Sequence, residues 1–148
     1  MRVRVLISVF LAAAPALLAL DGQFEKTIPF PKGGDVKLDW KYQDCMIQGL
    51  RILNYPADLD IEKAKREDPN DHTNIGWEFA IDNRSSNKFE VKLMVEVLDK
   101  SGQVIKAGDK SPNVSAHSAE RVKVSTRLRT VEAADAPKVR LRAAIIPK

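Results

Sequence analysis

The chain has one cysteine, Cys45, and only two histidines, His72 and His117, among its 148 residues. A single cysteine cannot form a disulfide within the chain, so packing has to hold the core together. Two histidines far apart in sequence, without a second cysteine, are too few for a zinc or transition-metal site of the usual ligand number. No His, Lys or Arg lies within three residues of Cys45. This favours a small buried residue over a reactive thiol.

The short motifs of catalytic and nucleotide-binding loops are also missing. The chain has no G-x-S-x-G elbow around a serine nucleophile, and no cysteine and histidine arranged with an orienting partner. The pair Gly33-Gly34 has neither the length nor the following helix of a phosphate-binding loop. We therefore expect a protein that is not an enzyme, with no catalytic residue and no cofactor.

Neither sign of charge is in large excess. The formal net charge is +4, but Arg2 and Arg4 lie in the N-terminal segment, and without these two the 24 Lys and Arg residues fall to 22, against 20 acidic residues. The field of such a nearly neutral chain is too weak to suggest a nucleic-acid partner. With 44% hydrophobic and 30% charged residues, the composition is that of a globular protein.

Residues 1–20 have the layout of a secretory signal peptide, because a cationic start is followed by an apolar run and small residues. As a helix, residues 5–20 would reach only about 24 Å, against a hydrocarbon core about 30 Å thick, which argues against a membrane anchor. The sequence leaves the exact cleavage site open. We expect a periplasmic or secreted protein with no stable membrane insertion after signal removal, in which residues 21–148 form a single domain.

Apolar and polar residues alternate over residues 75–81 and 89–97, the two runs around which the chain is organised. Side chains on a strand point alternately to opposite faces, so each run predicts a strand with one apolar face. We expect the centre of the core to contain Trp77, Phe79, Leu93 and Val95.

Weaker alternation elsewhere brings the number of expected strands to about eight, with no long amphipathic helix after residue 20. Short strands at this spacing favour a β-sandwich or a small barrel. Pro29 and Pro31 restrict the first of these strands to a sheet edge or a free arm. The further strands are expected at residues 24–30, 36–42, 46–53, 103–107, 122–128 and 139–145.

Three segments carry a resemblance to a known type of domain: W-E-F-A-I-D-N-R-S-S, then F-E-V-K-L-M-V-E-V-L-D-K-S-G-Q-V-I, then A-E-R-V-K-V-S. Together they resemble the immunoglobulin-like β-sandwich domains of exported bacterial proteins, of the FxLYD or late-embryogenesis-abundant-like type. The segment Val97-Leu98-Asp99 with Gly102 matches a strand-end motif of that type without its Tyr. The segment 116–119, Ala-His-Ser-Ala, replaces the usual Pro-Gly.

The resemblance spans about residues 46–128 and implies an all-β, immunoglobulin-like β-sandwich of about seven to eight strands with one short helical or loop insertion. It implies no catalytic residues, and a fold does not dictate a function. It also implies that residues 83–88 arch between two sheets. A plain hairpin at that point would instead place Trp77 opposite Leu93 and Glu78 opposite Lys92.

The charged insertion at residues 58–74 is where a specialised activity would be easiest to accommodate. A short helix is expected there, from Asp58 or Asp60 to about Arg66, with Pro69 ending it. The acids at 58, 60 and 62 have calcium-loop spacing, but Lys63 and Pro69 stand where the loop needs Gly and Glu. A metal-dependent or hydrolase-like activity centred on this insertion is the alternative function. Its possible oxygen ligands are Asp68, Asn70, Asp71 and Asn74.

Basic residues alternate with apolar ones in the last two expected strands. If these strands are neighbours in one sheet, seven basic side chains line one exposed face, which could bind an anionic polysaccharide, a lipid headgroup or an acidic protein. The competing interpretation is a solvated face balanced by acids of adjacent strands. The residues of this possible anion-binding face are Arg121, Lys123, Arg127, Arg129, Lys138, Arg140 and Arg142.

We therefore expect a non-catalytic, exported binding or structural module of the bacterial cell envelope. Its partner is an unknown envelope protein or an anionic polysaccharide, and not nucleic acid. Strand addition by the arm at residues 24–30 is a further possibility for assembly. The sequence does not define the ligand or the oligomeric state.

Overall fold

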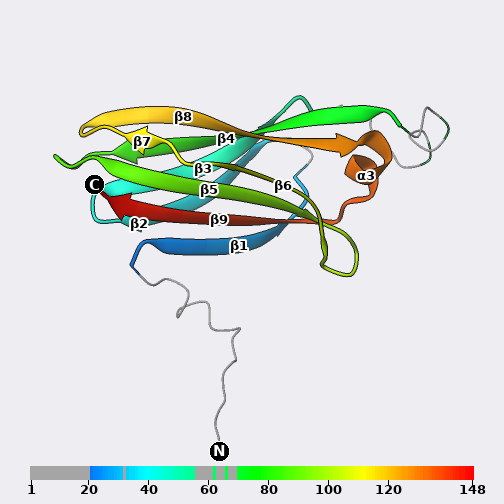
Figure 1. Ribbon diagram of the computed structural model, residues 1–148, viewed down its shortest axis with the longest axis horizontal. Coiled ribbons are helices and arrows are strands. Elements are labelled where there is room, and N and C mark those ends of the chain that lie inside the picture. The colour runs from blue at the N-terminus through cyan, green and yellow to red at the C-terminus, as the bar shows by residue number, and fades with distance from the viewer. Residues whose placement is uncertain (1–20, 32, 56–61, 63–65, 67–69) are drawn as a thin grey trace, which may run out of the picture.

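The alternating segments form strands in the computed structural model, which describes residues 21–31, 33–55, 62, 66 and 70–148. The described residues form nine strands and the six-residue helix α3, and two further described residues, Glu62 and Arg66, are also helical. Figure 1 shows the strands running side by side, with α3 at one end of the molecule. The elements are β1 (Gln23–Pro29), β2 (Asp35–Tyr42), β3 (Cys45–Leu53), β4 (His72–Asn83), β5 (Phe89–Leu98), β6 (Val104–Lys110), β7 (Asn113–Val114), β8 (Ser118–Arg129), α3 (Thr130–Asp135) and β9 (Lys138–Pro147).

The strands pair into two antiparallel sheets. Sheet 1 has the order β1-β9-β5-β6, with β7 also paired to β5, and sheet 2 has the order β2-β3-β4-β8. The chain passes from sheet 2 to sheet 1 between β4 and β5, and again between β8 and β9, while β4 pairs with β8 and β5 pairs with β9. Two strand pairs interlocked in this way are the central connectivity of immunoglobulin-like sandwiches. The expected all-β, immunoglobulin-like sandwich is confirmed.

The connection between β4 and β5 is an arch and not a hairpin, as the resemblance implied, because the two strands lie in different sheets. Asn83, fully buried at the end of β4, organises this arch. Its Nδ2 donates to the carbonyl oxygens of Asn87 at 2.8 Å and Ser115 at 3.0 Å, and more weakly to that of Val114 at 3.3 Å. Its Oδ1 accepts from the Ser85 amide at 3.0 Å and hydroxyl at 2.8 Å.

The core lies between the two sheets and is filled by their inward-facing apolar side chains. Trp77 is fully buried, and its Nε1–H donates to the Thr126 hydroxyl at 2.9 Å, so the one polar atom of the indole is satisfied. The Phe30 ring meets the indole edge to face, with centroids 5.5 Å apart. The four residues expected at the centre, Trp77, Phe79, Leu93 and Val95, are each at most 1% exposed.

The two sheets also approach each other along both edges of the sandwich. On one side, the Phe24 ring of β1 stacks on the Trp40 ring of β2, with centroids 5.6 Å apart and an interplanar angle of 11°. On the other side, β6 passes so close to β8 that a Cβ at Gly108 would meet the backbone oxygen of Ser125. A glycine is therefore required at this approach of two backbones.

The structure refines several expected elements. Strand β1 is an edge strand, as the prolines indicated. The six-residue helix α3 was not expected, because residues 130–137 read only as a break between strands. Irregularities in the β2/β3 and β3/β4 pairings shift the register, and these bulges leave no trace in the apolar alternation.

Two expectations fall largely outside the described residues. The signal segment 1–20 lies entirely outside them. Of the helix expected up to Arg66, only Glu62 and Arg66 are described, and both are helical. None of the helices in the described part of the chain is long and apolar enough to cross a bilayer.

The Asn83 side chain yields a stability prediction. Asn83→Ala removes all five of its hydrogen bonds and leaves buried backbone carbonyls unpaired, so we expect the free energy of unfolding to fall by about 2–4 kcal/mol. Urea unfolding followed by tryptophan fluorescence measures this change. Asn87→Ala is the matched control, because only the Asn87 backbone takes part in the arch, and we expect a change within about 0.5 kcal/mol. Equal losses in the two variants would contradict the assigned role of Asn83.

Candidate functional site

The seven basic residues expected on one face do not share a face. Strand β8 is the edge of sheet 2, whereas β9 lies inside sheet 1, and the outer faces of the two sheets point in opposite directions. The expectation that all seven basic side chains line one face of one sheet is therefore wrong. Helix α3 carries the chain from one sheet to the other between these strands (Figure 1). Alternation along a strand says which side chains share its face, but not which strand lies beside it.

The basic residues of β9 are neutralised by acids of the neighbouring strands. Glu96 of β5 accepts from Arg140 Nε at 2.7 Å, and its Oε1 lies 3.4 Å from Arg142 Nε. Arg142 also reaches Glu25 of β1 at 3.0 Å. The hydrogen bond from Arg140 lowers the pKa of Glu96, and the same bond raises the pKa of Arg140. This half of the expected anion site is thus a structural ion-pair network, although Lys138 at its end has no ion pair among the described residues.

The basic residues of β8 have far fewer acidic neighbours. We call Arg121, Lys123, Arg127 and Arg129 the β8 cationic row, because all four are exposed on the outer face of sheet 2. The two end residues have partial partners, since Arg121 lies 3.3 Å from Glu78 and Arg129 lies 3.4 Å from Glu132. The two inner residues, Lys123 and Arg127, form no ion pair within the described part of the chain.

A shallow hollow of about 320 Å³ adjoins one end of this row on the same face. The small residues Gly49 and Ala80, paired in register on β3 and β4, leave room for it. Gly49 is required there because a Cβ would meet the Val36 backbone oxygen. Glu78 on the rim serves two guanidinium groups, accepting from Arg51 Nε at 2.9 Å and from Arg121 at 3.3 Å. One carboxylate shared by two arginines leaves the rim positive on that side.

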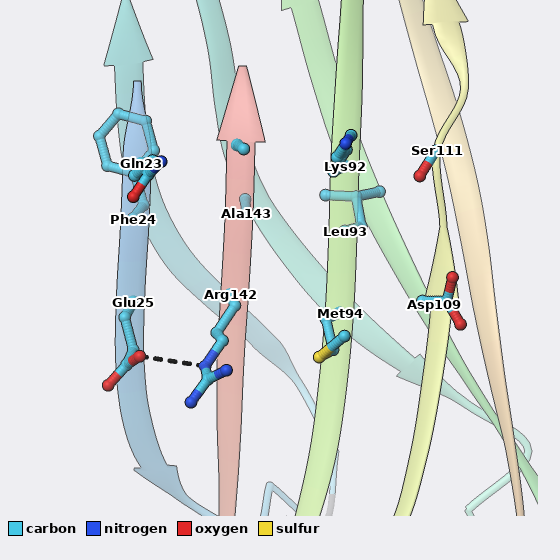
Figure 2. Close-up of a pocket in the computed structure, with 11 residues that line it drawn as sticks. Gln23, Phe24, Glu25, Lys92, Leu93, Met94, Asp109, Ser111, Arg142 and Ala143 are labelled. Carbon is cyan, nitrogen blue, oxygen red and sulfur yellow. Dashed lines mark ion pairs between the residues drawn. The ribbon is translucent and has the colours of Figure 1, made fainter. Parts of the chain in front are cut away.

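A second depression, of about 400 Å³, lies on the outer face of sheet 1. Figure 2 shows Glu25 of β1 and Arg142 of β9 pointing toward each other on one side of it, with Lys92 and Asp109 farther across. The small side chain of Ala144 on β9 leaves it open. Charges of both signs alternate around this depression, so it has no net preference for an ion of either sign.

The described residues contain no group of three or more His, Cys, Asp or Glu that could hold a metal ion. Of the possible oxygen ligands in the insertion, Asp68 lies outside the described residues. Asp71 is engaged locally, because its carbonyl oxygen accepts from the Thr130 amide at 2.8 Å and its carboxylate accepts from the His72 amide at 3.1 Å. Asn74 lies in β4 opposite Arg127, a cation that disfavours a metal ion beside it.

Two buried groups could carry chemistry in other surroundings. Cys45 is fully buried, and burial, with a contribution from the Asp82 carboxylate, raises the pKa of its thiol to about 11. It is therefore a protonated core residue at neutral pH, as expected. The hydroxyl of Tyr55 is buried beside Phe30 without a hydrogen-bond partner among the described residues, and burial raises its pKa. It stays a neutral phenol and is no base at physiological pH.

Comparison with known proteins assigns no family. No protein-family model and no curated protein matches this chain. Among solved structures, "The structure of a beta-glucuronidase from glycoside hydrolase family 2" is similar over 43% of this chain and 7% of that chain, with 17% identity and a TM-score of 0.37. This likeness covers a small part of a much longer protein and indicates no activity for the present chain. The resemblance to FxLYD-type domains stays a prediction.

The sequence did not reveal which acids neutralise the β9 arginines. Glu96 alternates with the apolar residues of β5, and this places it on an outer face without naming its neighbours. Only the register of three adjacent strands, in which Arg140 lies between Thr27 and Glu96, brings the opposite charges together. The sequence also did not reveal the hollow beside Arg121, because it depends on Gly49 of β3 lying opposite Ala80 of β4.

The Glu96 network yields a prediction for pH dependence. Because the pKa of Glu96 is lowered in the folded state from its ordinary 4.5, its contribution to stability is present above that value and is lost as the pH falls through the folded pKa. We expect Glu96→Gln to lower the free energy of unfolding at pH 7 by about 1–2 kcal/mol. The difference from wild type should shrink as the pH falls below about 4.5. Urea unfolding across this pH range measures both effects.

Glu90→Gln on the same strand is the control for this prediction. Its contact with the exposed Lys148 is 3.5 Å long, and we expect a loss below about 0.5 kcal/mol at pH 7. A Glu96→Gln variant as stable as wild type at pH 7 would show that the network contributes nothing to stability.

Proposed function

We propose that this protein is an exported, non-catalytic binding module of the bacterial cell envelope. One observation carries the proposal: each of the three buried polar residues that the structure describes is engaged in a structural hydrogen bond. Asn83 holds the arch, Thr126 accepts from Trp77, and Thr130 meets the Thr73 hydroxyl at 3.1 Å. The other polar side chains of the described residues lie on the outer faces of the two sheets. There they can contact a partner, and they do not form a cluster of the kind that catalysis requires.

The exported location is supported by the composition of residues 1–20, a cationic start followed by an apolar run. It is also supported by the kind of sandwich. The interlocked pairs β4/β8 and β5/β9 and the Asn-containing arch agree with the resemblance to domains of exported bacterial proteins. A sandwich with a closed apolar core binds its partners through its faces, edges and loops. We therefore assign the binding role to the surface of the domain.

The export part of the proposal is tested by expressing the full chain in a Gram-negative bacterium, followed by fractionation and intact-mass measurement. We expect the protein in the periplasm or medium, shortened by about the first 20 residues. The matched control is a chain with Leu6→Arg and Val9→Arg, which interrupts the apolar run and should leave an uncleaved precursor in the cytoplasm. Wild-type protein of full-length mass in the cytoplasm would contradict the export.

The binding part is tested by co-sedimentation of the purified protein with isolated envelope fractions, namely peptidoglycan, outer membrane and inner membrane. We expect retention by at least one fraction at low ionic strength. Absence of binding to all three would contradict an envelope-binding role, independently of where the protein is found.

A further inference from the structure

We infer that the β8 cationic row binds a linear anionic polysaccharide that carries carboxylate or sulfate groups. The inference rests on the proposed function and names the ligand class and the surface that the proposal leaves open. Four observations carry it: the cations without ion pairs among the described residues, their arrangement along one fully paired strand, the small or uncharged residues opposite Arg121 and Arg127, and the hollow at one end.

The charge balance of β8 is unlike that of the other cationic strand. In β9, Arg140 and Arg142 are held by Glu96 and Glu25 over 2.7–3.4 Å, so their positive charge is already matched. In β8, Lys123 and Arg127 form no ion pair among the described residues, because Glu78, which lies opposite Lys123, is held by Arg51 and Arg121. An anion that meets these two side chains does not have to displace a carboxylate of the protein.

The row lies along one strand that is hydrogen-bonded to its neighbour over its whole length. Strand β8 pairs with β4 along its whole length, from Ser118 opposite Asn83 to Arg129 opposite His72. Alternate side chains on one face of a strand are about 6.7 Å apart, so the row from Arg121 to Arg129 spans about 27 Å. Because β8 is the edge of sheet 2, no further strand of that sheet flanks the row. Cations in single file along an edge match a polymer with repeated anionic groups.

The residues of β4 beside the row leave space for such a polymer. The residues opposite Arg121, Ser125 and Arg127 are small or uncharged, namely Ala80, Gly76 and Asn74. Glu78 lies opposite Lys123, and His72 lies opposite Arg129. A Cβ at Gly76 would lie only 3.0 Å from Cδ of Lys123, so the glycine allows the lysine stem to lie flat over β4. A polymer lying over β4 therefore meets Arg121 and Arg127 from the side, and the one acid that it passes, Glu78, is already held by Arg51 and Arg121.

The hollow extends the surface at the Arg121 end. There Arg51 and Arg121 share the single carboxylate of Glu78, and this leaves guanidinium donors for an incoming anion. Asp35 also lines the hollow, whereas Asp39 and Asp82 are paired with Lys37 and Arg84. Because the cations of the row follow a single strand, they match a linear anionic chain better than the broad surface of a lipid bilayer.

The test compares two double variants of equal charge by titration with heparin, a linear sulfated polysaccharide. Lys123→Gln with Arg127→Gln removes the two unpaired cations of the row. Lys92→Gln with Lys138→Gln removes two exposed cations of sheet 1 that also have no ion pair among the described residues. All four substitutions are at exposed positions, so both variants should keep the wild-type melting temperature.

We expect wild type to bind heparin at 50 mM NaCl, and to bind at least tenfold more weakly at 300 mM because salt screens exposed charges. The β8 variant should lose about tenfold in affinity, and the sheet 1 variant should lose less than about twofold. Equal losses in the two variants would overturn the inference, because net charge and not the row would then determine binding. Absence of heparin binding by wild type at 50 mM NaCl would overturn it as well.

Two further probes exclude other classes of anion. Vesicles that contain phosphatidylglycerol test for a membrane, and poly-glutamate tests for an acidic protein. The assignment to a polysaccharide would be overturned if wild type bound either probe more tightly than heparin and the β8 variant did not bind that probe. Failure with heparin while the protein still sediments with an envelope fraction would reject this inference and leave the proposed function standing.

Discussion

The fold depends on the chain crossing between sheets immediately after β4. This crossing allows the apolar face of β4 to pack against that of β5 across the core, where a hairpin would put both strands in one sheet. Asn83 makes the crossing possible, because its amide satisfies backbone groups of the arch that would otherwise be buried without partners. Trp77 then fills the space between the sheets, with its indole nitrogen satisfied by Thr126. Strand β8 pairs with β4 in one sheet, and β9 pairs with β5 in the other.

The separation of β8 from β9 gives the two outer faces different electrostatic characters. Both strands alternate basic and apolar residues, and in isolation they are equivalent. In sheet 1, β9 lies between β1 and β5, which present Glu25 and Glu96 to its arginines. In sheet 2, β8 has a single neighbour within its sheet, and β4 offers one acid near the row, Glu78, which Arg51 already holds. A strand with one neighbour has half as many cross-strand partners for its charges. The proposed ligand surface is a consequence of the edge position.

The charged row also suits the edge strand of sheet 2, which β6 of the other sheet approaches from the core side at Gly108 and Ser125. Unpaired backbone groups at a sheet edge invite pairing with other chains, and charged side chains along the edge oppose such association. The β8 cationic row can serve both purposes, because repulsion between like rows discourages self-association while a polyanion is attracted. The other contact between sheet edges, where Phe24 stacks on Trp40, is apolar and closes the opposite side of the sandwich. The two sides of the molecule therefore differ in character, and the proposed anionic partner is assigned to the β8 side.

The sequence alone determined the strands, the burial of Trp77 and Cys45, and the face of its strand on which each basic residue lies. These properties follow from local alternation, since adjacent side chains on a strand must point to opposite sides. The arch was expected only through the resemblance of the segment around Asn83 to a known domain type. Only the tertiary structure decided that β8 and β9 lie in different sheets, that Glu96 neutralises the arginines of β9, and that two cations of β8 form no ion pair with the described residues. Strand neighbours depend on contacts between segments distant in the sequence, and the alternation within one strand carries no information about them.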